Sequence, residues 1–475
     1  MANRPPNTNW CPDPSIFSNQ HVKVILEQNP IRLHHILRRR SSWPFCWGEA
    51  GLEAGRWLPP PAPRSWRTRS RWLAQKATGF PRSMALRKSP LISANMAGMI
   101  QSMRMQLSNA SAPPKPENLL FAGGNQPARR DFGISAIVLE DTVIPICAVD
   151  SAATPFCSLI EFSRADIPAQ PSLLIVAPLS GHFPVILRDL VLGLLPSFKV
   201  YVTDWLNVRH VPAEHGSFGL EDNISCVLDM IISLPPGLTV VALCQGGVPA
   251  LAATALLARN SRSHTPAALI LMACPIDPLA KPSGVARLLR SRPLSWFENS
   301  LITTVPELYA GAGRRVYPAH LHLLPLLTYL TRRLVQGSEI AAKLLSDDGS
   351  DPGRFPFLDL VTSIMDLDAK YLLENTKAVF QERLLPKGSL LFQGERVDLR
   401  AIEHTALLTI EGERDDIAPP GQTSAAHALC SSLPAHRHHS LTVSGSGHFS
   451  LFHGSTCRGV VQPAILEFLK IHGAQ

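Results

Sequence analysis

The feature that most constrains this chain is a regular alternation of short apolar segments with amphipathic stretches. Apolar segments of the buried-strand type occupy residues 172–179, 199–205, 238–244 and 267–274. The stretches between them have helical patterning over about ten to fifteen residues. Strands that are apolar along their whole length and alternate with helices are typical of βαβ units. The alternation therefore predicts an α/β fold with a mainly parallel sheet.

The alternation stops near residue 275 and resumes near residue 400. The intervening region is poor in strand patterns and shows helical patterns at 317–346 and 359–382. Apolar strand patterns return at 406–413 and 438–443. We therefore expect residues 275–400 to be a helical insertion of the kind that forms a lid over a hydrolase site.

This pattern predicts how the rest of the chain is organised. We expect residues 135–274 and 401–475 to form the two parts of one catalytic core, and residues 84–134 to form a helical or extended lead-in. Residues 1–83 hold six of the eight tryptophans and many Pro and Arg residues, without sustained apolar periodicity. Such a composition cannot supply a continuous core face, so it predicts a disordered basic tail.

The net charge of +8 originates in this tail. Residues 21–90 contain fourteen Lys and Arg residues against three acidic residues, and residues 1–20 are neutral, which leaves −3 on the remainder. A mildly acidic body argues against a nucleic-acid-binding protein. The tail either binds an anionic or apolar surface or has no function of its own, and the sequence leaves both readings open.

The chain has no obvious membrane or metal-binding segment. No run of eighteen apolar residues is present, and the N-terminus lacks an apolar signal core, so we expect no transmembrane segment and a cytoplasmic location. The nine cysteines form no CxxC pair, and none lies near a histidine at zinc-ligand spacing. We therefore expect no metal site and no cofactor.

The segment VVALCQGGVPALAA carries the strongest chemical signal. An apolar strand runs into Cys244, and a Gln-Gly-Gly turn then leads into a helix-forming run. In α/β hydrolases the nucleophile occupies such a turn, written G-x-S-x-G; here Cys replaces Ser, Ala242 replaces the first Gly, and Gly246 keeps the second. We interpret Cys244 as the nucleophile and the backbone N–H of Gln245 as an oxyanion donor. The alternative is a buried structural cysteine.

Partners for this cysteine follow in the expected chain order, acid before base. Asp415 follows the strand at 406–413, and Asp416 is its competitor. His448 lies in a Gly/Ser-rich loop after the last strand. We expect His448 to accept the thiol proton and Asp415 to orient the imidazole and stabilise its charge.

A second oxyanion donor is expected from the segment PLSGHF, which follows the strand at 172–179. A backbone N–H near Ser180 or Gly181 is the candidate, since small residues allow close approach. His182 in the same loop either faces the site or has a structural role at the start of a helix.

Several segments resemble the intracellular polyhydroxyalkanoate (polyhydroxybutyrate) depolymerases. The segments are APLSGHFPVILRDLV, KVYVTDWLNVRHVP, VVALCQGGVPALAA, PELYAGAGRRVYPAHL, VFQERLLPKGSL and TIEGERDDIAPPGQT with SGSGHFSLFHG. The resemblance runs from about residue 115 to the C-terminus. It implies an α/β hydrolase that cleaves (R)-3-hydroxyalkanoate esters at the surface of storage granules. It also implies Cys244 as nucleophile, His448 as base and Asp415, rather than Asp416, as acid.

The sequence departs from that family at one position beside the nucleophile. The family usually has Pro two residues after the cysteine, whereas this chain has Gly246 followed by Gly247. The glycine pair is similar to the C-x-G box of polyhydroxyalkanoate synthases, which also use Cys, Asp and His. Three readings therefore stay open: a depolymerase, with water or coenzyme A as acyl acceptor, a synthase-like acyltransferase, and a non-catalytic granule-associated protein.

Overall fold

A nine-stranded sheet forms the centre of the computed structural model, which describes residues 132–321 and 364–473. The strand order is β1-β2-β3-β5-β4-β6-β7-β13-β14. The predicted tail at 1–83 and nearly all of the lead-in at 84–134 lie outside the described residues. The predicted domain boundaries therefore remain predictions.

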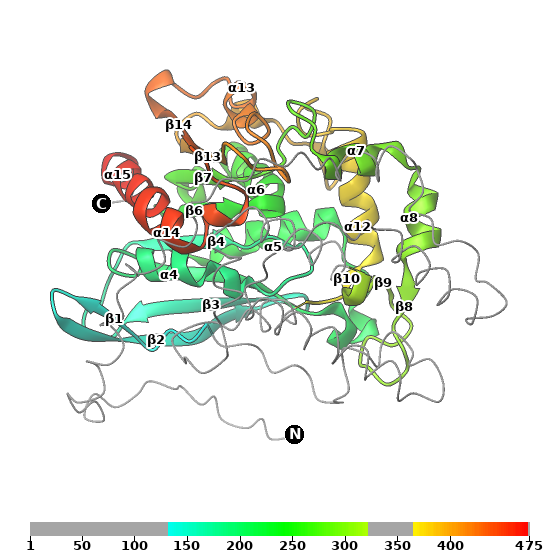
Figure 1. Cartoon of the computed structure of the whole chain (residues 1–475), viewed down its shortest axis with the longest axis horizontal. Coiled ribbons are helices and arrows are strands. Elements are labelled where there is room, and N and C mark those ends of the chain that lie inside the picture. Colours follow the sequence, from blue (N-terminus) through cyan, green and yellow to red (C-terminus); the bar gives the residue numbers. More distant parts are fainter. Residues whose placement is uncertain (1–131, 322–363, 474–475) are drawn as a thin grey trace, which may run out of the picture. The chain divides into compact units, whose positions relative to one another are not determined.

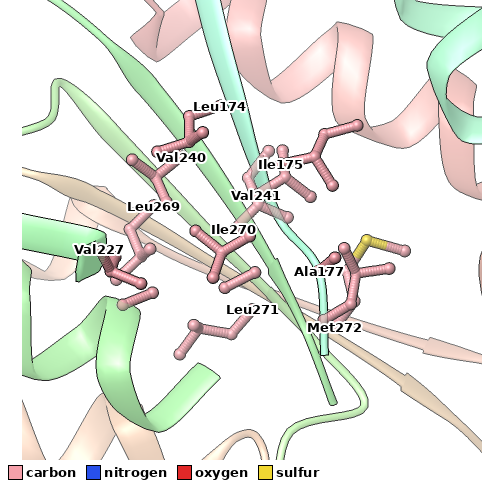
Figure 2. Close-up of a cluster of buried hydrophobic side chains, with 14 of the residues drawn as sticks. Leu174, Ile175, Ala177, Val227, Val240, Val241, Leu269, Ile270, Leu271 and Met272 are labelled. Carbon is pink, nitrogen blue, oxygen red and sulfur yellow. The ribbon is translucent and has the colours of Figure 1, made fainter. Parts of the chain in front are cut away.

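Six consecutive strands of this sheet run parallel, and they lie where the apolar segments predict them. They are β4 (Ser172–Val176), β5 (Lys199–Trp205), β6 (Thr239–Leu243), β7 (Ala268–Met272), β13 (Ala406–Gly412) and β14 (His438–Val443). The inner strands are buried on both faces, and Figure 2 shows side chains of β4, β6 and β7, such as Val240 and Ile270, packed together. The sheet and its helices confirm the predicted α/β-hydrolase fold.

The edge of the sheet opposite β14 is antiparallel. β2 (Thr142–Ala153) pairs with β1 (Ala136–Leu139) and with β3 (Cys157–Arg164), and β3 pairs with β5. The short strand β1 thus forms a hairpin with β2 at the outer edge of the sheet.

Helices cover both faces of the sheet. α4 (Arg188–Leu194) contacts α15 (Gln462–His472), and α5 (Leu220–Ser233) contacts α6 (Gly247–Asn260); Figure 1 shows the two pairs on opposite sides of the parallel strands. Among the described residues, none of the helices has the length and apolar character needed to cross a membrane.

The insertion between β7 and β13 contains both helices and strands. Its described helices are α7 (Gly284–Ser291), α8 (Leu294–Leu301), α12 (Ala369–Asn375) and the π-helical turn η9 (Thr376–Gln381). It also contains two small antiparallel sheets, β8 (Thr303–Thr304) with β9 (Arg315–Tyr317) and β10 (Leu367–Asp368), and β11 (Leu391–Phe392) with β12 (Glu395–Arg396). The helical prediction did not include these strands, because two or three residues are too few to show alternation. Most of the helical pattern predicted at 317–346 lies outside the described residues.

The order of the parallel strands places the predicted site residues near one another. From β4 the chain moves to β5 on one side and then returns to β6 on the other side of β4. This reversal is a topological switch point, and in open α/β sheets ligands bind at the carboxyl ends of the strands there. The turn carrying Cys244 follows β6, and the loop carrying Ser180 and Gly181 follows β4.

Candidate active site

Cys244 occupies a sharp turn between β6 and α6. The strand ends at Leu243, a 3-10 turn covers Cys244–Gly246, and α6 begins at Gly247. The φ of Cys244 is +48°, a left-handed conformation that is rare for residues other than glycine. Such a conformation persists only where the surrounding structure imposes it, and it is frequent at functional sites. The turn has the conformation expected of a nucleophile elbow.

Gly246 is required by the close packing of this turn against β4. A Cβ atom at position 246 would lie 2.7 Å from the carbonyl oxygen of Val176 and 3.2 Å from that of Ala177. A Cβ atom at Gly247 would collide with Cys274. The two glycines therefore allow the start of α6 to approach the ends of β4 and β7.

Asp415 and His448 meet in loops that follow β13 and β14. Asp415 Oδ2 lies 2.7 Å from His448 Nδ1. The other carboxylate oxygen of Asp415 accepts hydrogen bonds from the backbone N–H groups of Ile417 and Ala418, at 2.8 and 2.9 Å. These bonds fix the carboxylate with one oxygen directed at the imidazole. The bond from His448 is to Asp415 rather than to Asp416.

The imidazole of His448 is buried between this carboxylate and Cys244. Burial lowers its pKa, but the charges of Asp415 and Cys244, with hydrogen bonds to both, outweigh burial and hold the pKa well above the usual value. The rings of Phe449 and Phe452 meet the imidazole edge-on, with centroids 5.4 Å away. The structure thus brings Cys244, His448 and Asp415 together from three separate loops.

The loop after β4 lies next to the elbow and is joined to the insertion. The approach of Gly246 to the end of β4 places the loop beside the turn. Gly181 has a φ of +85°, and its carbonyl oxygen accepts a hydrogen bond of 2.8 Å from the backbone N–H of Met365. His182 forms an isolated antiparallel bridge with Ile364. The insertion thereby holds the loop that carries the predicted second oxyanion donor.

His182 in this loop has the properties of a neutral imidazole. Burial lowers its pKa to about 4, and a hydrogen bond to the backbone of Ser180 only partly opposes that effect. Its Nε2 atom is buried without a hydrogen-bond partner. At neutral pH the ring is therefore uncharged.

Sequence reasoning missed Tyr371, a buried residue of α12. Its hydroxyl donates to the side-chain oxygen of Gln245 at 3.4 Å. Burial raises the pKa of Tyr371, and the charge of Cys244 raises it further, which places the hydroxyl within electrostatic reach of the sulfur. No local sequence pattern connects residues separated by 126 positions.

The candidate site is separate from a cavity in the described part of the chain. That cavity, of about 650 Å³, is bounded by the segments 213–217 and 312–315 and by the start of α12. None of the predicted site residues lines it. Within residues 132–321 and 364–473, no group of three or more His, Cys, Asp or Glu side chains is arranged to hold a metal ion.

Comparisons with known proteins show one family and a group of hydrolase structures. Residues 273–473 match the model of the family described as "PHB de-polymerase C-terminus"; the matched range includes Asp415, His448 and Tyr371, whereas Cys244 precedes it. No curated protein matches the chain.

Three solved structures illustrate the structural likenesses. A hydrolase from Pseudomonas aeruginosa PA01 has 16% identity and a TM-score of 0.40, covering 68% of this chain and 98% of its own. The monoacylglycerol lipase of Paleococcus ferrophilus has 15% identity and a TM-score of 0.40, and the match covers 67% of this chain and 99% of the lipase. A thermophilic esterase from Thermogutta terrifontis has 15% identity and a TM-score of 0.39, and the match covers 69% of this chain and 99% of the esterase.

Proposed function

We propose, since the chain belongs to the PHB depolymerase family through its residues 273–473, that it cleaves the ester bonds of a poly-(R)-3-hydroxyalkanoate by way of a thioester on Cys244. In this proposal His448 is the general base and acid, and Asp415 is its orienting carboxylate. The site of action is the surface of a cytoplasmic storage granule, and the insertion forms the lid over the reacting chain.

The first half of the reaction forms the acyl-enzyme. His448 takes the proton of Cys244, and the thiolate attacks the ester carbonyl carbon. The negative charge on the carbonyl oxygen is stabilised by the backbone N–H of Gln245 and by an N–H of Ser180 or Gly181. The C–O bond to the leaving alkoxide then breaks, and the alkoxide takes the proton from His448.

The second half returns the enzyme to its starting state. His448 removes a proton from water, and the hydroxide attacks the thioester carbonyl. The C–S bond breaks, and the thiolate is protonated by His448. The products of the full cycle are a carboxylic acid and an alcohol, with water as the acyl acceptor.

The observation that carries the proposal is the 2.7 Å contact of His448 Nδ1 with Asp415 Oδ2, in an imidazole that also interacts with Cys244. A carboxylate on Nδ1 holds the ring so that Nε2 can serve the nucleophile. Cys244 is the only one of the six free cysteines in the described residues with a positive φ.

Cys244→Ala is the direct test. We expect it to abolish release of 3-hydroxybutyrate from native amorphous granules, because no other thiol can form the acyl-enzyme. Cys226→Ala, which changes another free cysteine, is the matched control and should release product at the wild-type rate. Release by Cys244→Ala at the wild-type rate would rule the mechanism out.

Faster alkylation of Cys244 by iodoacetamide than of the other thiols would separate an active site from a non-catalytic granule protein.

The Gly246-Gly247 pair supports a second candidate function, that of a synthase-like acyltransferase. The close approach of position 246 to the Val176 carbonyl favours glycine there, as in the C-x-G box of the synthases. A synthase-like enzyme forms the same thioester but transfers the acyl group to a hydroxyl chain end. Incubation with 3-hydroxybutyryl-coenzyme A separates the two: polymer accumulation supports the acyltransferase. Formation of 3-hydroxybutyryl-coenzyme A from granules and free coenzyme A indicates thiolysis.

A further inference from the structure

The hydroxyl of Tyr371 lies at the candidate active centre, although its helix belongs to the insertion. The side chain is 2% exposed. Its one hydrogen bond reaches the side chain of Gln245, the residue that directly follows Cys244. The influence of Cys244 on the pKa of this phenol indicates that the hydroxyl and the sulfur share one environment.

The position of Tyr371 is fixed by buried contacts at both ends of α12. At the start of the helix, Asp368 accepts a hydrogen bond from the backbone N–H of Phe218 at 3.1 Å and pairs with the buried guanidinium of Arg314. Nearer its end, Glu374 accepts a hydrogen bond of 2.8 Å from the backbone N–H of Leu220. The helix is thus bound to the start of α5. A donor held in this way needs little reorganisation when charge develops nearby.

The donor capacity of this hydroxyl is largely unused. A hydroxyl typically donates over 2.7–2.8 Å, whereas Tyr371 lies 3.4 Å from the Oε1 atom of Gln245, so the bond is weak. A buried hydroxyl without a good partner is costly, which suggests that its partner is a transient one. The backbone N–H of Gln245 is a proposed oxyanion donor, so the hydroxyl lies beside the place where negative charge develops.

We propose that Tyr371 is a further catalytic residue, whose hydroxyl donates a hydrogen bond to the carbonyl oxygen of the substrate as that oxygen becomes negatively charged. It is a third oxyanion donor, supplied by the insertion rather than by the core. No proton is transferred, and the bond to Gln245 is exchanged for a shorter one to the oxyanion. This inference rests on the proposed function of Cys244.

The test compares Tyr371→Phe with Tyr317→Phe. Both tyrosines belong to the insertion, Tyr371 fully buried and Tyr317 partly buried, but the hydroxyl of Tyr317 donates to the Leu321 carbonyl at 3.5 Å, and burial alone raises its pKa to about 12. We expect Tyr371→Phe to lower kcat on the order of 10²-fold with little change in KM, because the lost bond forms only in the transition state. Tyr317→Phe should keep wild-type kcat.

Two ester substrates test whether the Tyr371 hydroxyl donates its hydrogen bond to the carbonyl oxygen or to the leaving oxygen. p-Nitrophenyl 3-hydroxybutanoate has a good leaving group, and methyl 3-hydroxybutanoate has a poor one, but both form an oxyanion on the same acyl carbonyl. An equal fold-loss on both supports the proposal. A loss confined to the methyl ester overturns it, because the hydroxyl would then assist the leaving oxygen. A loss that appears as raised KM alone overturns it as well.

Two further measurements keep the result interpretable. Thermal denaturation of Tyr371→Phe should match that of Tyr317→Phe within a few degrees, so that lost folding cannot imitate lost catalysis. Wild-type activity in Cys244→Ala means that the proposed function fails. An inactive Cys244→Ala together with a fully active Tyr371→Phe means that the inference on Tyr371 alone fails.

Discussion

Two loops at the carboxyl edge of the sheet have the same four residues, Ser-Gly-His-Phe, and contain histidines of opposite character. The first loop, residues 180–183, follows β4; the second, residues 446–449, follows β14. Burial lowers the pKa of His182 to about 4. His448 is buried as well, but the charges of Asp415 and Cys244 raise its pKa well above the usual value. Identical local sequence therefore yields an imidazole with a lowered pKa in one loop and an imidazole with a raised pKa in the other, and the difference is due to the tertiary partner.

The largest expected effect on this difference between the two histidines comes from removing the carboxylate that pairs with His448. Asp415→Asn removes one of the two charges that oppose the effect of burial on His448, and so brings this imidazole closer to the state of His182. The tautomer and orientation of the imidazole are also lost. We expect kcat on granules or soluble esters to fall on the order of 10⁴-fold. Asp416→Asn is the matched control; if it lowers kcat as much as Asp415→Asn does, the assignment of the acid is wrong.

The second prediction uses the opposite signs of the two pKa shifts. His182 has a lowered pKa in the folded state, so its contribution to the free energy of unfolding is present above about pH 6.5 and is lost as pH falls from there towards 4. That loss is on the order of 3 kcal/mol, at about 1.4 kcal/mol for each pH unit. His448 has a raised pKa, so its contribution is present below pH 6.5 and is lost as pH rises through the raised value.

Urea denaturation of His182→Gln and His448→Gln over a pH series measures both effects. The wild type should lose more stability than His182→Gln on acidification, and more than His448→Gln on alkalinisation. The same direction in both variants would contradict the contrast between the loops.

The smallest expected effect concerns Gly246, whose turn packs against the end of β4, where the first loop begins. Gly246→Ala places a methyl group against the carbonyl oxygens at the end of β4. We expect the free energy of unfolding to fall by about 1–3 kcal/mol, and kcat to fall because the elbow is displaced. Gly459→Ala is the matched control: a Cβ atom there meets nothing within 4 Å, in the helical turn Cys457–Val461. A wild-type melting curve for Gly246→Ala would show that the close approach is not required.

The sequence contains enough information for the central parallel strands β4, β6 and β7, because each is apolar along nearly its whole length. The placement of Asp415 and His448 also follows from the sequence, since they lie in the loops that follow the strand patterns of β13 and β14. The distinction between the two Ser-Gly-His-Phe loops depends on their positions in the strand order and cannot be read from the four residues themselves. Tyr371 was missed because its contact with Gln245 depends on how α12 docks on α5. Position 246 stood out in the sequence as a departure from Pro, but only the distance to Val176 explains a glycine there.

The backbone bond from Met365 to Gly181, with the bridge between Ile364 and His182, has a consequence for engineering and for evolution. The insertion cannot be exchanged between relatives as an independent module, because part of it supports the loop after β4, which carries the proposed second oxyanion donor. A chimaera that takes a foreign insertion must also take the loop after β4 from the same parent. Natural changes of substrate range in such enzymes should accordingly appear as paired changes in the two segments.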